Sequence, residues 1–120
     1  MKNIQAQNAE KVVQRNLNAY NAREIKAFMA EFTDDIKLIN FSDQKIITEG
    51  KSAIEKLYSE LFEQSPSLHS TILKRMVLEN KVIDHESITG RKGNAEAIEL
   101  IMIYEVKDDK IYKMTVIRPE

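Results

Sequence analysis

The sequence predicts an α+β domain in which three helices come first and pack on one face of an antiparallel sheet. Two observations predict this class. Apolar residues recur every three or four positions in three stretches before residue 65, as they do on one face of a helix. After residue 69, apolar and polar residues alternate between turn residues, as in strands joined by hairpins. With 120 residues, the chain from 1 to 120 is expected to form one domain around one core.

The first two helices are predicted between residues 9 and 32. Val13, Leu17 and Tyr20 share one face of a helix that runs from about residue 9 to residue 21. Asn16 is a polar residue within this apolar face. A second, shorter helix follows, and its apolar side carries Ile25, Phe28, Met29 and Phe32.

The third helix is predicted after a short hairpin. Thr33-Asp34-Asp35 is typical of a turn, and strands are predicted at 36–41 and 45–48. Ser52 and Glu55 have the spacing of a capping box, and Ser65-Pro66-Ser67 ends the helix. The apolar face of this helix consists of Ile54, Leu57, Tyr58, Leu61 and Phe62.

The next hairpin carries most of the charged residues of interest. Asn80-Lys81 is predicted as a two-residue turn between strands at 70–79 and 82–89. In this register Arg75 lies opposite Glu86. Because side chains alternate along a strand, Arg75, Asp84 and Glu86 share one face, and His85 lies on the other.

The last hairpin is predicted to join residues 95–106 to 110–118 through a three-residue loop with a bulge. Its apolar face pairs Ile98, Leu100, Met102 and Tyr104 with Arg118, Val116, Met114 and Tyr112. The opposite face mixes Glu99 and Glu105 with Ile101 and Ile103. Such a mixed face is typical of a dimer interface, so we expect a homodimer.

Charge and composition exclude several kinds of partner. Lys and Arg number 18 against 19 Asp and Glu, which gives a net charge of −1 and argues against nucleic acid and anionic membranes. No apolar run approaches a membrane span, and the first residues lack the apolar core of a signal peptide. We therefore expect a cytoplasmic protein. No cysteine, no nucleotide-binding motif and only two distant histidines predict that it uses neither cofactor nor metal.

Motifs along nearly the whole chain resemble one superfamily. Residues 12–15, Asn21-Ala22 and 28–35 resemble the opening of ketosteroid isomerases and SnoaL-like polyketide cyclases. Residues 50–54 with Tyr58 resemble their third helix, and residues 104–111 resemble their last hairpin. The chain is therefore similar to the nuclear-transport-factor-2-like superfamily. The resemblance implies a cone-shaped fold, with three helices on a strongly curved antiparallel sheet that encloses a pocket, and a homodimer.

The resemblance also implies that the chain is not a standard ketosteroid isomerase. Those enzymes use a tyrosine, a basic aspartate and a protonated aspartate. Asn16, Asn40 and Met102 occupy the matching positions of this sequence. An amide cannot take up the proton and a thioether cannot donate one, which excludes that mechanism.

Asp84 and Glu86 are the candidate catalytic residues. Two carboxylates on one strand face, with Arg75 opposite, can hold a base in a water-poor pocket while the arginine orients it or an anionic ligand. The alternative is an ion pair on a solvated face. A slip of one residue in the hairpin would bring His85 to the pocket in place of both acids.

The remaining candidates are ligand-binding residues. Asn16 and Asn40 either satisfy neighbouring backbone groups or bind a ligand carbonyl. Tyr20, Tyr58, Tyr104, Met102 and Met114 are expected in the core or pocket wall, with the hydroxyls free to reach a ligand. Arg118 either closes the pocket mouth and binds an acidic group or reaches solvent.

Two functions follow from these residues. The first is a small-molecule-binding protein, with an isomerase, cyclase or lyase activity that transfers a proton on an apolar, carbonyl-bearing ligand. The second is a non-catalytic ligand-binding or dimerisation module. An open cavity with the acids would favour the first, and a cone filled by methionine and tyrosine side chains the second.

Overall fold

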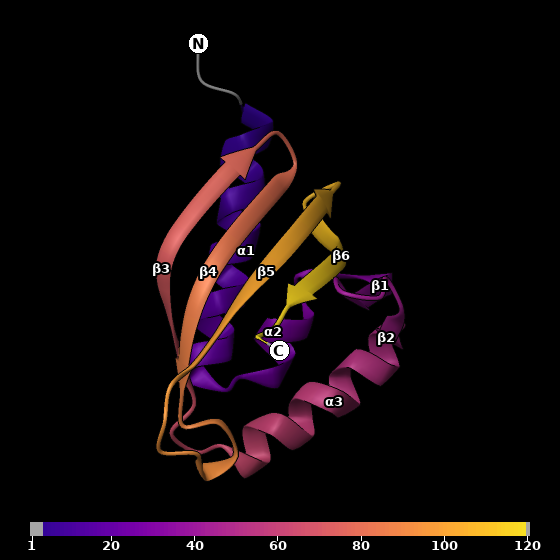
Figure 1. The fold of residues 1–120 in the computed structure, drawn as a ribbon. Coiled ribbons are helices and arrows are strands. Elements are labelled where there is room, and N and C mark those ends of the chain that lie inside the picture. The colour runs from indigo at the N-terminus through magenta and orange to yellow at the C-terminus, as the bar shows by residue number, and fades with distance from the viewer. Residues whose placement is uncertain (1–3, 120) are drawn as a thin grey trace.

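The structure of the chain, a computed structural model, describes residues 4–119. Three helices and a six-stranded curled sheet confirm the α+β class (Figure 1). No helix of the described part is long and apolar enough to cross a membrane. In chain order the elements are α1 (Ile4–Ala22), α2 (Ile25–Met29), β1 (Phe32–Asn40), β2 (Ile46–Glu49), α3 (Lys51–Gln64), β3 (His69–Leu78), β4 (Lys81–Thr89), the 3-10 turn η1 (Arg91–Gly93), β5 (Ile98–Lys107) and β6 (Lys110–Ile117).

The strands form one sheet in the order β2-β1-β6-β5-β4-β3. Neighbouring strands are antiparallel, except that β1 and β6 run parallel. Helix α1 packs across β3, β4 and β5, and α3 packs against β1, β2 and η1 (Figure 1). We call the sheet face that carries the helices the inner face and the opposite one the outer face.

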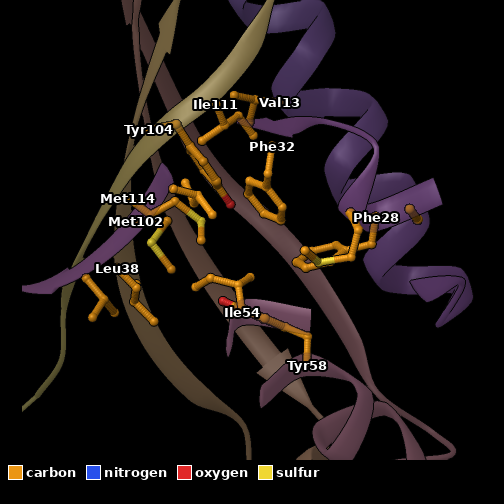
Figure 2. Packing of buried hydrophobic residues seen from close by; sticks show 14 of the residues in the cluster. Val13, Phe28, Phe32, Leu38, Ile54, Tyr58, Met102, Tyr104, Ile111 and Met114 are labelled. Carbon is orange, nitrogen blue, oxygen red and sulfur yellow. The ribbon is translucent and has the colours of Figure 1, made fainter. Parts of the chain in front are cut away.

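The core fills the space between the helices and the inner face. Phe28 joins the layers, because its ring centroid lies 4.6 Å from that of Tyr58 in α3 and 5.1 Å from that of Phe32 in β1. Such separations are those of favourable aromatic pairs. Figure 2 shows Phe28 and Tyr58 of the helices on one side and Met102, Tyr104 and Met114 of the sheet on the other. The core is thus built where the sequence predicts it.

Three local predictions before β3 are wrong. Phe32, predicted on the second helix, is the first residue of β1, because α2 ends at Met29. The segment 33–35 is not a turn but belongs to β1, where Thr33 Oγ1 donates to Asp35 Oδ1 at 2.7 Å. The capping box does not form, since Gly50 is the N-cap of α3 and Ser52 already lies inside the helix. The helix begins there because the Gly50 carbonyl accepts from the Ile54 N–H at 3.0 Å.

The β3–β4 hairpin turns one residue earlier than predicted. Glu79 and Asn80 form the turn, because Asn80 exchanges two hydrogen bonds with Val106, of 3.0 and 2.9 Å, and lies outside the ladder. Arg75 consequently pairs with Asp84 and not with Glu86. From Arg75 to Leu78 the pairing moves by two residues, so Arg75, Asp84 and Glu86 keep their predicted face. A bulge between Ile72 and Lys74 interrupts the alternation along β3, and Leu73 is 51% exposed.

The last hairpin shows the same kind of shift. Asp108 and Asp109 form the turn, with φ of 51° and 59°, and a bulge lies between Glu105 and Val106. The inner-face residues of β5 keep their predicted face but pair two positions further along. Tyr112 lies beyond the bulge and is half-buried, with its hydroxyl 3.3 Å from Glu105 Oε1. It does not face the core as predicted.

Candidate functional site

A cavity of about 350 Å³ lies between α1, α3 and the inner face of the sheet. Small-molecule sites in proteins have volumes of this order. Most of its wall is apolar, and it opens to solvent beside α3. Of the residues that the sequence predicts as functional, the cavity is lined by Asn16, Tyr20, Tyr58, Glu86, Met102, Tyr104, Met114 and Arg118.

Glu86 is the buried acid of this cavity. It lies in the middle of β4, where it is 5% exposed, between Ile72 of β3 and Leu100 of β5. Ser70 Oγ donates a hydrogen bond of 2.6 Å to Glu86 Oε1. Burial, helped by the nearby charge of Asp84, raises the pKa of Glu86 to about 7, although the Ser70 bond acts in the opposite direction.

Three tyrosine hydroxyls surround the same space. Tyr20 comes from α1, Tyr58 from α3 and Tyr104 from β5, and all three line the cavity. Burial raises the pKa of Tyr58 to about 12 and the pKa values of the other two above their ordinary range, so all three stay protonated donors.

None of these hydroxyls has a hydrogen-bond partner among residues 4–119. In that part of the chain, no fully buried side-chain nitrogen or oxygen lacks a partner. The hydroxyls are therefore not sealed in the core but remain open to the cavity. A buried phenol ordinarily finds a partner, so these three donors are available to a ligand.

The other predicted lining residues contribute shape. Asn16 Nδ2 donates to the Phe28 carbonyl at 3.1 Å, so its amide satisfies a neighbouring backbone group while the residue also borders the cavity. Met102 and Met114 form apolar wall opposite Tyr58 (Figure 2).

Arg75 and Asp84 lie next to the cavity but do not line it. Asp84 is 0% exposed, and both its oxygens accept from Arg75, Nε to Oδ1 at 2.7 Å and Nη2 to Oδ2 at 2.9 Å. Arg75 Nη1 donates to Gln14 Oε1 of α1 at 2.8 Å. The pair is therefore enclosed beneath the helix, with its hydrogen-bonding groups directed at each other.

Asn40 and His85 also lie apart from the cavity. Asn40 Nδ2 donates to Asp43 Oδ1 at 2.9 Å in the turn after β1. His85 is on the outer face, with Nε2 at 2.7 Å from Glu99 Oε1. Glu86 and Asp84 thus both lie on the inner face, as predicted from the sequence, but only Glu86 reaches the cavity.

The cavity entrance contains cations that the sequence did not single out. Arg91 and Lys92 of η1 line it together with Arg118 at the end of β6. The loop packs closely on the segment after α3, because Gly90 has φ of 73° and a Cβ there would lie 2.3 Å from the Ser67 carbonyl oxygen. Gly90 indicates a turn in the sequence. The positions of Arg91 and Lys92, which follow it, depend on the three-dimensional fold.

No group of three or more His, Cys, Asp or Glu side chains within residues 4–119 is arranged to hold a metal ion. Among the described residues, the cavity lining instead contains two carboxyls, Glu60 and Glu86, together with two amides, three phenols and three cations. This set can donate hydrogen bonds to a ligand oxygen and exchange a proton with a ligand carbon or oxygen.

Comparison with known proteins agrees with this architecture. The family model for a SnoaL-like domain matches residues 13–114. A comparison with curated proteins gives no match.

Several solved structures share the fold. A cystatin-fold protein from Novosphingobium aromaticivorans has a TM-score of 0.82 and 23% identity, covering 92% of this chain and 97% of its own. A SnoaL-like protein of unknown function from Burkholderia thailandensis has a TM-score of 0.77 and 16% identity, covering 99% and 100%. A protein with a ketosteroid isomerase-like fold from Catenulispora acidiphila, in complex with trimethylamine, has a TM-score of 0.73 and 16% identity, covering 88% and 83%. At these identities the likeness establishes the fold and leaves the chemistry to the site.

Proposed function

Because the chain belongs to the SnoaL-like domain family, in which the fold leaves the chemistry open, we propose a function from the cavity itself. The protein binds a small apolar, carbonyl-bearing ligand there, and Glu86 transfers a proton on it. One observation carries the proposal: Glu86 is a buried carboxyl in the same hollow as three tyrosine hydroxyls that have no hydrogen-bond partner among the described residues. Its pKa of about 7 means that acid and base forms coexist near neutral pH, as proton transfer in both directions requires.

The proposed step is enolisation. The ionised Glu86 takes a proton from the carbon beside the ligand carbonyl, and the C–H electron pair forms the new C=C bond. The carbonyl π electrons move to oxygen, which a tyrosine hydroxyl stabilises by donating a hydrogen bond. Return of the proton from Glu86 to carbon regenerates the carboxylate, so the step balances without a cofactor.

Asp84 is a weaker candidate for this role. Arg75 holds both of its carboxylate oxygens, and neither residue lines the cavity. A base must reach the proton that it abstracts. Asp84 therefore acts on Glu86 only through space, by raising the Glu86 pKa.

Exchange of carbon-bound hydrogen tests the proposal without an identified substrate. 2-Tetralone, an apolar ketone, is incubated in D₂O with the protein, and loss of its α-hydrogen NMR signals is followed. The protein should accelerate exchange, Glu86→Gln should abolish the acceleration, and Glu99→Gln, which changes an acid on the outer face, should keep it. Equal exchange by the protein and Glu86→Gln would contradict proton transfer by Glu86.

The second candidate function is non-catalytic binding. The Asn16 amide, which already bonds the Phe28 carbonyl, and the thioether of Met102 favour it, since neither group can transfer a proton. This candidate predicts that 2-tetralone binds, as measured by calorimetry, with no acceleration of exchange.

The outer face supports a homodimer. Met76, Ile83 and Ile103 lie side by side on successive strands, and Ile101 pairs with Ile117 beside them. Met76 is 55% exposed, and covering this strip would remove apolar surface from water. Sedimentation should give twice the 13.9 kDa chain mass, and Ile103→Lys should give the single chain. A single-chain mass for the unchanged protein would contradict the dimer.

The cytoplasmic location stays a prediction from the sequence.

A further inference from the structure

The cavity entrance gathers positive charge from two distant segments. Arg91 and Lys92 lie in η1, after β4, and Arg118 follows the end of β6, yet all three line one hollow. The β4–β5 connection lies beside the C-terminal end of α3, which forms the same side of the entrance (Figure 1). The charges of both arginines act on Tyr58 in the cavity wall, where they partly oppose the rise in its pKa that burial causes.

The side chains of these three cations have no charged or hydrogen-bonding partner in the part of the chain that the structure describes. Within residues 4–119, none of the three makes an ion pair or donates a side-chain hydrogen bond. The other three arginines all have partners: Arg15 and Arg75 are paired with carboxylates. Arg23 donates to the backbone carbonyls of Asn21 and Leu68. Among residues 4–119, the acids in the cavity lining are Glu60 of α3 and Glu86. Three cations thus stand against two acids, and Glu86 lies at the buried inner wall, away from solvent.

We propose that the cavity selects an amphipathic organic anion, whose apolar body lies against the inner wall and whose carboxylate or phosphate lies between Arg91 and Arg118 at the entrance. A guanidinium presents two parallel N–H donors that match either head group, and two guanidiniums can share one anion. The remaining polar groups of the ligand then face Glu86 and the tyrosines. This inference names the substrate class of the proposed site, so it rests on ligand binding in that cavity, though not on proton transfer.

A matched pair of probes tests it. 2-Naphthoate and 2-naphthamide have nearly the same shape and differ in charge, and calorimetric titration measures the affinity of each. The protein should bind 2-naphthoate roughly tenfold or more tightly than 2-naphthamide. Arg91→Gln and Arg118→Gln should each reduce the affinity for 2-naphthoate by a larger factor than the affinity for 2-naphthamide. Lys107→Gln, a cation outside the cavity, should change neither. 2-Naphthyl phosphate, titrated in parallel, shows which of the two head groups is preferred.

The outcomes separate this inference from the proposed function. If 2-naphthamide binds and 2-naphthoate binds no more tightly, the anion preference is wrong and ligand binding in the cavity stands. Equal losses for both probes in the arginine variants would also overturn the preference. If neither probe binds at millimolar concentration, ligand binding in the cavity and the anion preference both fall. Added salt should weaken 2-naphthoate binding alone, because ions screen exposed charges.

Discussion

Ser70 Oγ donates a hydrogen bond of 2.6 Å to Glu86 Oε1, and both residues are buried in the inner face of the sheet. The bond is made to the charged form of a carboxyl that burial favours in its neutral form. Ser70 is itself fixed, because its N–H donates to Asn21 Oδ1 at 2.8 Å. The ionisation of Glu86 is thus set by a balance between desolvation and one positioned donor.

Removing that donor should destabilise the protein in a pH-dependent way. Ser70→Ala deletes a bond to the ionised Glu86, so the loss in free energy of unfolding should be about 1–3 kcal/mol at pH 8 and smaller at pH 5. Urea unfolding at the two pH values measures it. Ser87→Ala, on the outer face of the neighbouring strand β4, should lower the free energy of unfolding by the same small amount at both pH values. An equal loss for Ser70→Ala at both pH values would show that the bond does not favour the charged form.

Glu86 should make the protein less stable as pH rises. Its pKa is about 7 in the folded protein against an ordinary 4.5, so the folded state holds a proton that the unfolded chain has lost between these values. The free energy of unfolding should therefore fall by about 3 kcal/mol from pH 4.5 to pH 8. Glu86→Gln should remove this part of the pH dependence and be the more stable form at pH 8, whereas Glu99→Gln should keep it. Parallel curves for all three proteins would exclude a raised pKa.

Replacing only one residue of the Arg75–Asp84 pair should strongly lower the free energy of unfolding. Arg75→Met leaves Asp84, which is 0% exposed, without its partner, and should lower the free energy of unfolding by about 3–5 kcal/mol. Arg15→Met, which breaks the more exposed pair with Glu31, should lose less than about 1 kcal/mol.

The double variant Arg75→Met/Asp84→Leu separates an unpaired charge from lost packing. It should recover much of the stability, because no buried charge is left without a partner. A double variant as unstable as Arg75→Met would instead point to packing between Arg75 and α1 as the main contribution.

Gly90 should tolerate alanine less well than Gly93 does, because only Gly90 lies close to the Ser67 carbonyl. Gly90→Ala places a Cβ 2.3 Å from the Ser67 carbonyl oxygen and should lower the free energy of unfolding by about 2–4 kcal/mol, through the clash and the left-handed φ together. Gly93→Ala has the same kind of φ with nothing within 4 Å of its Cβ, and should lose about 1–2 kcal/mol. Thermal unfolding of the two variants measures both losses. Equal losses would mean that the Ser67 contact relaxes freely.

The fold and the buried faces followed from periodicity. Alternation along β4 was enough to place Asp84 and Glu86 on the inner face, because a pairing error of two residues does not change the side to which a strand residue points. The error itself came from Asn80, whose bonds to Val106 involve a strand more than 20 residues away in the chain. The residues around Asn80 in the sequence do not indicate a contact with a residue so far along the chain.

The site was predictable only in part for the same reason. Separating Asp84 from Glu86 requires knowing that Arg75 closes on Asp84 beneath Gln14 of α1. Placing Arg91 at the same cavity as Arg118 requires the curl of the sheet, since the two are far apart in sequence and Arg91 belongs to no apolar pattern. Periodicity predicts faces, and the contacts between distant elements decide which residues of a face meet in the cavity.

Proton transfer by Glu86 depends above all on the ionisation of its carboxyl in the folded protein, which NMR can measure. Glutamate side chains labelled with ¹³C at the carboxyl are titrated by NMR, and the Glu86 signal is assigned as the one missing from Glu86→Gln. We expect a midpoint near pH 7 for this signal, because Glu86 is buried in the cavity. A midpoint near the ordinary 4.5 would show a carboxyl that is solvated and ionised at neutral pH, and would contradict the account.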